Sequence, residues 1–374
     1  MKFTLSSTKL LQQMQALARV IASKNSLNIL ECVLFNLEGN QLILTASDGE
    51  TTMRTQIEVE QAEGQGKIAF QAKMLLDTLK EFPELPLTFD INDQTFGLNI
   101  QSSNGTYNLV GINGAEYPEM VQELENARSF NFAAEALLNA LNKTVFCTAD
   151  DELRPVMNGV FFDIATDKIT LVATDAHRLV RYINTTISLP EPASFILPKK
   201  PANLLRSILG KEQEDVKINF TDKNVRFEFG QTIVICRQIE GRFPNYNAVI
   251  PQNNRNKVTV DRQTILTTVR RVSVFANPGT GLIKLELGDN KINISAQDID
   301  FSTSADETIE CSYEGEPMSI GFKAPFLMEI LATLQSDNVI FEIENPNRAG
   351  LILPFDNEAN EDLVMLLMPM LLND

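Results

Sequence analysis

The chain has 374 residues, 44% of them hydrophobic, and a formal net charge of −17 at pH 7. This length predicts two or three globular domains, each able to bury a core of its own. No apolar run reaches the length of a secretion signal or a membrane-spanning helix, which excludes an exported or membrane protein and predicts a cytoplasmic one.

Three copies of one pattern follow one another along the chain. Each copy opens with a short strand and a helix, continues with a strand that ends in a turn bearing an aspartate, and adds a second helix. The opening strands are expected at residues 3–5, 130–132 and 258–260, and the aspartate turns close segments 44–48, 171–175 and 294–298. The six helices are expected at 6–24, 72–82, 133–147, 198–211, 261–276 and 323–335. A period of roughly 125 residues predicts three like domains, at 1–125, 126–252 and 253–374.

Between the helices the chain alternates apolar and polar residues over short runs separated by turn residues. Segments 33–37 and 42–46 form one such pair, and segments 159–164 and 169–173 form another. This pattern predicts antiparallel hairpins. Each domain is therefore expected to be α+β, with two helices packed on antiparallel sheets.

The net charge alone argues against binding to nucleic acid, but its distribution reverses that inference. The six predicted helices hold 14 Lys and Arg against 5 Asp and Glu, so the rest of the chain is strongly acidic. In the first helix, Leu10, Met14 and Leu17 share one stripe while Lys9 and Arg19 lie opposite, on a face without acids. Such a face suits a helix that lies at a modest distance from the phosphates of a nucleic acid. The alternative interpretation is an ordinary solvated helix face. The later copies repeat the basic bias, which favours a molecule with one basic and one acidic surface.

The sequence contains no recognisable catalytic or metal-binding motif. Cys32, Cys147, Cys236 and Cys311 lie far apart and are expected to be reduced core thiols, with neither a disulfide framework nor a zinc site. The acidic segments 150–152 and 358–362 lack the spacing of a calcium loop and are interpreted as solvated loop charge. The single histidine, His177, follows Asp175 by two residues, and no nucleophile is tied to the pair by a motif, so a binding loop or a plain turn is favoured over catalysis. We expect no enzyme activity, no metal and no cofactor.

Four short motifs in a fixed order carry a resemblance to a known family. They are Thr-Asp-Ala-His-Arg-Leu at 174–179, Gly-Arg-Phe-Pro-Asn-Tyr at 241–246, Arg154 with Met-Asn-Gly at 157–159, and Leu-Met-Pro-Met at 367–370. With these motifs in this order within a threefold repeat, the chain resembles the beta subunit of bacterial DNA polymerase III, a sliding clamp, over essentially its whole length.

The resemblance implies an architecture and a set of partners. It implies three tandem domains of the DNA-clamp fold and a head-to-tail homodimer whose six domains form a ring, with basic helices inside and sheets outside. Such a ring encircles double-stranded DNA without reading its sequence and acts as a processivity factor. The implied partners are the DNA polymerase III alpha subunit, the clamp loader, and other polymerases and repair proteins with clamp-binding motifs. The implied location is the cytoplasm, in association with the nucleoid.

The resemblance also implies three groups of site residues. A pocket for partner peptides is implied at Arg154, Met157, Thr174, His177, Arg178, Leu179, Pro244, Val249, Leu367, Met368, Pro369 and Met370. DNA contacts are implied at Lys24, Lys73, Lys199 and Lys200. For each of these lysines, the alternative interpretation is a solvated surface charge that does not contact DNA. The pocket residues suit an apolar slot with a polar rim that takes a Leu and a Phe from an extended peptide.

The subunit seam is supported by helical spacing as well as by the resemblance. On helix 261–276, Val274 lies opposite the core-facing Ile265, and Phe275 is also off the apolar stripe. These two residues match the family's dimer contacts, and Tyr107 and Leu109 on an edge strand of the first domain are their implied partners. Burial under a local loop is the alternative.

The chain departs from the family pattern at two places. Ala176 stands where many relatives have Gly, which narrows the predicted slot, and the tail 371–374 differs from the usual basic ending. Two other functions stay open at this point: an adaptor that never encircles DNA, with scattered basic residues and a monomeric state, and a hydrolase that uses Asp175 and His177.

Overall fold

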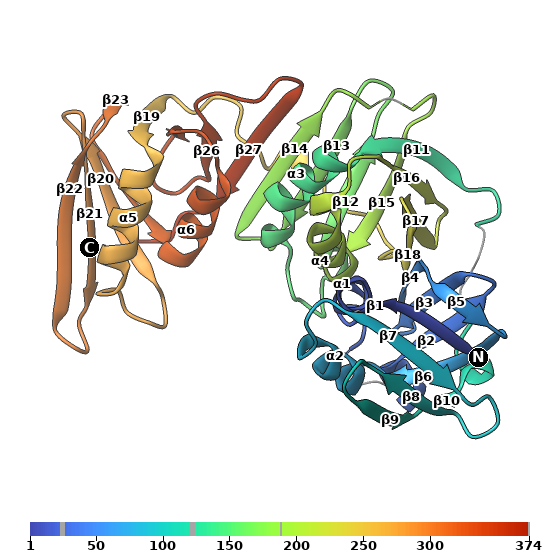
Figure 1. Cartoon of the computed structure of the whole chain (residues 1–374). Helices are drawn as coiled ribbons and strands as arrows, with labels where there is room; N and C mark the ends of the chain where they lie inside the picture. Colours follow the sequence, from blue (N-terminus) through green and yellow to red (C-terminus); the bar gives the residue numbers. More distant parts are fainter. Residues whose placement is uncertain (23–26, 120–123, 188, 373–374) are drawn as a thin grey trace. The chain divides into compact units, whose positions relative to one another are not determined.

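The structure is a computed structural model that describes residues 1–22, 27–119, 124–187 and 189–372. The chain divides into two compact units, Met1–Leu138 with Lys200–Gln238 and Asn139–Lys199 with Ile239–Asp374. Each unit combines helices with antiparallel sheets (Figure 1), as expected for the α+β class. No helix among the described residues is long and apolar enough to span a membrane.

The described residues contain six α-helices, one inside each predicted window. They are α1 (Ser7–Leu17), α2 (Ala72–Lys80), α3 (Ala134–Thr144), α4 (Lys199–Ile208), α5 (Arg262–Ser273) and α6 (Ala324–Thr333). The Ser6 hydroxyl accepts a hydrogen bond from the Lys9 backbone N–H at 3.1 Å and so caps α1. Leu10 and Met14 are fully buried while Lys9 is exposed, which confirms the predicted apolar stripe.

The first unit contains two sheets. The five-stranded sheet has the order β5 (Glu60–Glu63), β1 (Lys2–Ser6), β7 (Pro86–Ile91), β8 (Gly97–Gln101) and β9 (Thr106–Val110). The nine-stranded sheet has the order β10 (Ile112–Asn113), β6 (Gly66–Gln71), β2 (Cys32–Glu38), β3 (Gln41–Ser47), β4 (Thr51–Glu58), β18 (Thr232–Arg237), β17 (Asn224–Phe229), β16 (Asp215–Phe220) and β11 (Arg128–Ala133). β2 and β3 form the first predicted hairpin, with Phe35 opposite Leu44.

The second unit also contains two sheets. The nine-stranded sheet has the order β15 (Ala193–Pro198), β12 (Gly159–Ile164), β13 (Ile169–Thr174), β14 (Arg178–Asn184), β27 (Glu361–Leu367), β26 (Gly350–Pro354), β25 (Asn338–Ile343), β19 (Asn256–Asp261) and β23 (Ser312–Glu314). The four-stranded sheet has the order β22 (Thr303–Glu310), β21 (Lys291–Asp298), β20 (Leu282–Gly288) and β24 (Met318–Lys323). β12 and β13 form the second predicted hairpin.

Both nine-stranded sheets run from one sequence repeat into the next. In the first unit, β4 of the first repeat pairs antiparallel with β18 of the second, with Met53 opposite Val234. In the second unit, β14 of the second repeat pairs antiparallel with β27 of the third, with Val180 opposite Met365. In each case the strand that follows the aspartate turn pairs with the last strand of the next repeat. The corresponding strands left over, β22 and β9, lie at the edges of their sheets.

The cysteines are free thiols, and three of them are core residues. Cys32, Cys147 and Cys236 are buried, and Cys311 is half-buried. Burial raises the pKa of all four thiols, so they are protonated and poorly nucleophilic at neutral pH. These groups therefore serve packing rather than chemistry.

Candidate functional site

The β13–β14 turn is held by a network of local hydrogen bonds. Oδ1 of Asp175 accepts the backbone N–H groups of His177 at 3.0 Å and Arg178 at 2.9 Å. The Thr174 hydroxyl accepts from the Ala176 N–H at 3.1 Å and donates to the Arg178 carbonyl at 2.7 Å. Ala176 has φ +73°, in the left-handed region that favours glycine. The turn thus holds His177 at the surface on a partly strained backbone.

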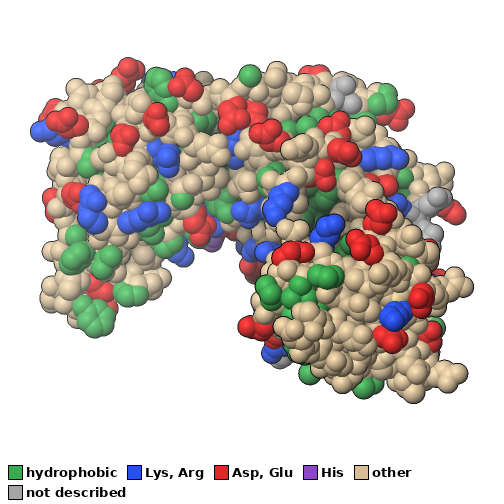
Figure 2. Space-filling model, in the orientation of Figure 1, with side chains coloured by type: hydrophobic (Ala, Val, Ile, Leu, Met, Phe, Trp, Pro, Cys, Tyr) green, Lys and Arg blue, Asp and Glu red, His purple; other side chains and the backbone are tan. Residues whose placement is uncertain are grey.

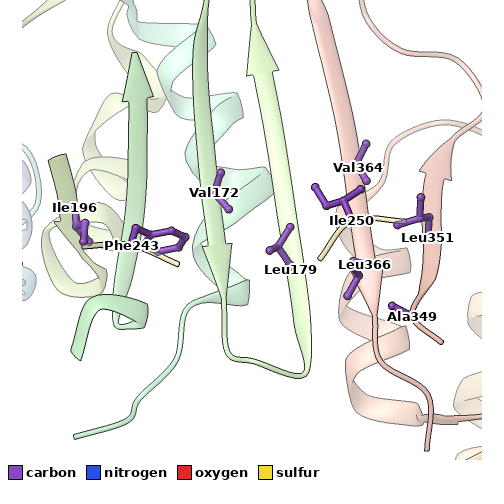
Figure 3. Packing of buried hydrophobic residues seen from close by; sticks show 9 residues of the cluster. All are labelled: Val172, Leu179, Ile196, Phe243, Ile250, Ala349, Leu351, Val364 and Leu366. Carbon is purple, nitrogen blue, oxygen red and sulfur yellow. The ribbon is translucent and has the colours of Figure 1, made fainter. Parts of the chain in front are cut away.

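An apolar cluster lies beneath this turn and joins the second repeat to the third. It consists of Val172, Leu179, Ile196, Phe243, Ile250, Ala349, Leu351, Val364 and Leu366, all at most 8% exposed. Figure 3 shows Leu179 on β14 facing Leu366 on the adjacent β27. Burying one Leu of this kind contributes about 2 kcal/mol, so the cluster fixes the two strands together.

The segment after Ile239 is anchored on the same cluster. The Phe243 ring stacks on Phe161 with 4.7 Å between centroids, and the Tyr246 hydroxyl donates to Asp163 at 2.7 Å. Burial, together with this hydrogen bond, raises the pKa of Tyr246 to about 12. With these side chains fixed inside, Pro244 and the 56% exposed Val249 remain on the surface.

The C-terminal segment is fixed by backbone hydrogen bonds at two points. The Met368 N–H donates to the His177 carbonyl at 2.8 Å, which attaches the segment to the β13–β14 turn. The Met370 N–H donates to the Gly321 carbonyl at 2.8 Å. A Cβ on Gly321 would lie 2.7 Å from the Met370 carbonyl oxygen, so only glycine permits this approach. Met368 is 43% exposed between these two attachments.

Arg178 lies inside the junction and supports the surface from below. Its guanidinium donates to Asp175 at 2.9 Å, to Glu329 at 2.6 Å and to the Phe146 carbonyl at 3.1 Å. It also lies 4.4 Å from the ring centroid of Phe326 on α6. Burial alone would lower the pKa of Arg178, but the bond to Glu329 and the nearby carboxylates raise it on balance.

The twelve predicted pocket residues fall into three groups. Five are exposed: Arg154, His177, Pro244, Val249 and Met368. Three are half-buried: Met157, Pro369 and Met370. Four are buried: Thr174, Arg178, Leu179 and Leu367. Their role in peptide binding stays a prediction, and the buried four occupy supporting positions beneath the exposed surface.

Asp175 and His177 are not arranged as an acid–base pair. The two carboxylate oxygens of Asp175 accept the backbone N–H groups of the turn and the Arg178 side chain. The His177 ring lies against Phe326, with 6.0 Å between ring centroids. Asp175 therefore shapes the turn and holds an arginine, and it does not orient the imidazole.

A buried polar cluster at the same junction was not foreseen from the sequence. The Lys143 ammonium lies 2.6 Å from Glu361, and both side chains are 8% exposed. The Tyr182 hydroxyl also donates to Glu361, at 2.5 Å, and burial with this bond raises the pKa of Tyr182. The interpretation of segment 358–362 as solvated charge is thus wrong for Glu361, because its partners come from distant elements that sequence spacing cannot reveal.

The predicted DNA-contacting lysines differ in whether their ammonium groups are paired with a carboxylate. Lys24 lies outside the described residues, and Lys73 on α2 is exposed. The Lys199 ammonium lies 2.6 Å from Asp150. Lys200 donates to the Val20 carbonyl at 2.6 Å and forms an ion pair with Asp48. Lys200 therefore ties α4 to the first repeat as well as carrying charge.

The predicted seam residues are surface side chains. Val274 and Phe275, at the end of α5, are 79% and 41% exposed, so the local sheet leaves them uncovered as expected. Tyr107 on the edge strand β9 is 40% exposed and packs edge-on against Phe82, with 5.1 Å between centroids. Leu109 on the same strand is half-buried. Their part in subunit contact stays a prediction.

Comparison with known proteins matches the whole length of the chain. Residues 1–121, 131–245 and 247–371 match the models of the N-terminal, central and C-terminal domains of the DNA polymerase III beta subunit. The beta sliding clamp of Pseudomonas aeruginosa is 26% identical over 366 residues, covering 98% of this chain and 99% of that protein. The beta sliding clamp of Staphylococcus aureus is 24% identical over 373 residues, covering 98% of each.

Solved structures agree with these sequence matches. A Pseudomonas aeruginosa sliding clamp superposes with a TM-score of 0.93 at 26% identity, covering 100% of both chains. A Bartonella birtlesii sliding clamp superposes with a TM-score of 0.92 at 26% identity, also covering 100% of both chains. The chain belongs to the family of the DNA polymerase III beta subunit, the beta sliding clamps, which are non-catalytic processivity factors of DNA replication.

Proposed function

We propose that two copies of this chain join head to tail into a ring around duplex DNA and hold the replicative polymerase on its template. The observation that carries this proposal is the repeated strand pairing at the internal junctions. β4 pairs with β18 and β14 pairs with β27, while β22 and β9 remain as sheet edges. Pairing β22 of one copy with β9 of the next uses these edges in the same way, and three domains per chain favour closure with two copies.

The basic helices supply the surface that faces DNA in this proposal. Contacts to phosphates rather than bases make binding independent of sequence, so the ring slides, and retention depends on closure rather than on affinity. Lys24, Lys73, Lys199 and Lys200 are the proposed phosphate contacts. Lys199 and Lys200 contribute less than Lys73, because Asp150 and Asp48 compensate part of their charge.

A topological experiment tests the ring. The protein is loaded by an ATP-driven clamp loader onto a nicked circular duplex, and the bound fraction is followed after gel filtration in high salt. We expect retention on the circle and rapid loss once the circle is cut to a linear form. Equal loss from the two forms would exclude encirclement and favour an adaptor that never encloses DNA.

The proposed phosphate contacts are tested by charge reversal. Lys73→Glu should reduce loading and lower its salt dependence, because one phosphate contact becomes repulsive. Lys223→Glu is the matched control, since Lys223 is exposed in the turn between β16 and β17 and outside the basic helices. Equal effects of the two substitutions would contradict the assignment of the helices to the DNA-facing surface.

The surface formed by the β13–β14 turn, the 244–249 segment and Met368–Met370 is the proposed site for partner peptides. Pro244, Val249 and Met368 are exposed and follow or precede the buried cluster residues Phe243, Ile250 and Leu366 closely in the chain. His177 and Arg154 are exposed polar side chains proposed for the rim. This composition suits an extended peptide with apolar side chains, for which Met offers an adaptable wall. The alpha subunit of the polymerase, the clamp loader, and other polymerases and repair proteins are proposed to compete for it.

A further inference from the structure

In two of the three repeats, the opening strand is covered on its outer edge by a later strand of the same repeat. In the first repeat, β5 pairs antiparallel with β1 on the side away from β7. In the third repeat, β23 pairs antiparallel with β19 on the side away from β25. β1 and β19 therefore each have a pairing strand on both edges.

The second repeat lacks such a covering strand. Among the described residues, β11 ends its nine-stranded sheet and pairs only with β16. The described residues between β14 and β15 occupy the place of β5 and β23 in the repeat, but they form no strand. Pro190 and Pro192 in this segment have no backbone N–H to donate, and the Thr185 N–H donates to the Asn360 carbonyl at 3.0 Å. One edge of β11 is therefore left without a described partner strand.

The exposure of matching side chains agrees with this difference between the repeats. Thr4 in β1 is only 9% exposed, and Thr259 in β19 is half-buried. Asn131, at the same position of β11, is exposed, and so are Ser129 and Ala133 on the same face of the strand. The face beside the open edge of β11 is therefore accessible, and the backbone groups of such an edge can pair with an extended segment of another chain.

The two covered edges also indicate the charge of a strand that fits. In the first repeat, Lys2 of the opening strand lies opposite Glu63 of the covering strand. In the third repeat, Lys257 of the opening strand lies opposite Glu314 of the covering strand. Both covering strands thus place a carboxylate opposite a lysine, and opposite charges in this arrangement favour strand pairing.

In the second repeat the lysine stands on the neighbouring strand. Ser129 occupies the position of the two lysines, whereas Lys217 on β16 lies opposite Asn131 and is exposed. Glu228 on β17 lies opposite Lys217 but forms its ion pair with Arg226, at 3.1 Å, and Lys217 pairs with no described carboxylate. Strands lie about 4.8 Å apart, so a carboxylate on a strand added beside Asn131 starts about 10 Å from the Lys217 backbone, within reach of two long side chains.

The acidic character of the chain does not prevent such a local attraction. Figure 2 shows lysine and arginine side chains dispersed among acidic ones over the visible face of the molecule. Salt screens exposed charges beyond about 10 Å, so the nearest charges decide which segment fits, rather than the net charge of −17.

We propose that the open edge of β11 binds an extended acidic segment of a partner protein as an added antiparallel strand. The segment pairs with the backbone of β11 as β5 pairs with β1, and one of its carboxylates faces Lys217. Backbone pairing provides most of the affinity, and Lys217 contributes the preference for an acidic segment. This site uses none of the residues of the proposed peptide surface and requires no second copy of the chain.

Hydrogen exchange of the full chain with a synthetic peptide tests the site. The probe is Val-Glu-Gln-Ala-Glu-Gly-Gln, the sequence of residues 59–65, because it contains the covering strand of the first repeat. We expect saturating peptide to slow exchange of amides within residues 129–133 about fivefold or more, with no change at residues 2–6. Unchanged exchange at 129–133 would overturn the proposal. Protection that grows with protein concentration in the absence of peptide would also overturn it, because a second copy would then occupy the edge.

A second peptide and a pair of variants separate backbone pairing from charge. A peptide with Pro in place of its central Gln and Ala cannot form the ladder and should give no protection, and equal protection by both peptides would refute strand addition. Lys217→Glu should weaken binding of the original peptide about fivefold, because an attraction becomes a repulsion. Lys291→Glu is the matched control, since Lys291 is exposed on β21 in the other unit. Equal affinities of the two variants would remove Lys217 from the site.

Discussion

Replacement of Arg178 by Met removes a buried charge that supports the proposed peptide site. The Arg178 side chain is 7% exposed, and its guanidinium bonds to Asp175, Glu329 and the Phe146 carbonyl. Methionine has a similar length and fills the space beside Phe326, so the substitution tests the charge network rather than the packing. We expect the junction between β14 and α6 to lose stability.

The magnitude follows from which partners remain buried. Removal of one partner of a buried ion pair costs about 3–5 kcal/mol, because the other charge is left without compensation. The Glu329 side chain is 53% exposed and regains water, whereas the Asp175 side chain is only 15% exposed. Asp175 also keeps its two backbone N–H donors. We therefore expect the lower end of that range, about 3 kcal/mol.

Calorimetric unfolding measures this loss, with Arg154→Met as the matched control. The Arg154 side chain is 48% exposed and pairs with Asp151 at the surface, so its loss should cost at most about 1 kcal/mol. Arg178→Lys should fall between the two, because it keeps the charge but loses the forked geometry. Equal melting temperatures for Arg178→Met and Arg154→Met would refute the supporting role of the buried network.

Three further substitutions test the turn, the anchored segment and the C-terminal segment. Ala176→Gly should stabilise the protein by about 1 kcal/mol, because it removes a Cβ from a backbone at φ +73°; a lower melting temperature would contradict the strain. The raised pKa of Tyr246, about 12 against about 10 in the unfolded chain, contributes stability that is complete below pH 10 and is lost as pH rises toward 12. Tyr246→Phe should abolish that part of the alkaline loss, and identical pH profiles would reject it. Met368→Ala should weaken polymerase stimulation and peptide binding about tenfold without changing the dimer, and unchanged binding would remove Met368 from the site.

The repeat and the helices could be predicted because their signals are local. Leu10, Met14 and Leu17 lie within α1 and are fully buried, as their spacing required. The end of α1 was predicted less well, since the helix ends at Leu17 although the expected helix extended to residue 24. Hairpins such as β2–β3 were also predictable, because alternation and turn residues lie within one short segment.

The ion pairs at the junctions between repeats could not be predicted, because the partners are far apart in sequence. Lys143 and Glu361 are 218 residues apart, and Lys200 and Asp48 are 152 residues apart. Nothing in the local pattern of segment 358–362 distinguishes Glu361 from its solvated neighbours. Desolvation and pairing are properties of the packed junction, so only the coordinates reveal them.

The sequence by itself determined the threefold repeat, the α+β class and the basic character of the helices, because periodicity and composition are properties of short segments. The tertiary structure alone decided which charges remain free in water, which side chains support the peptide surface from beneath, and which strands are left as edges. These outcomes depend on antiparallel pairing between repeats, such as β14 with β27, and on the burial that this pairing imposes.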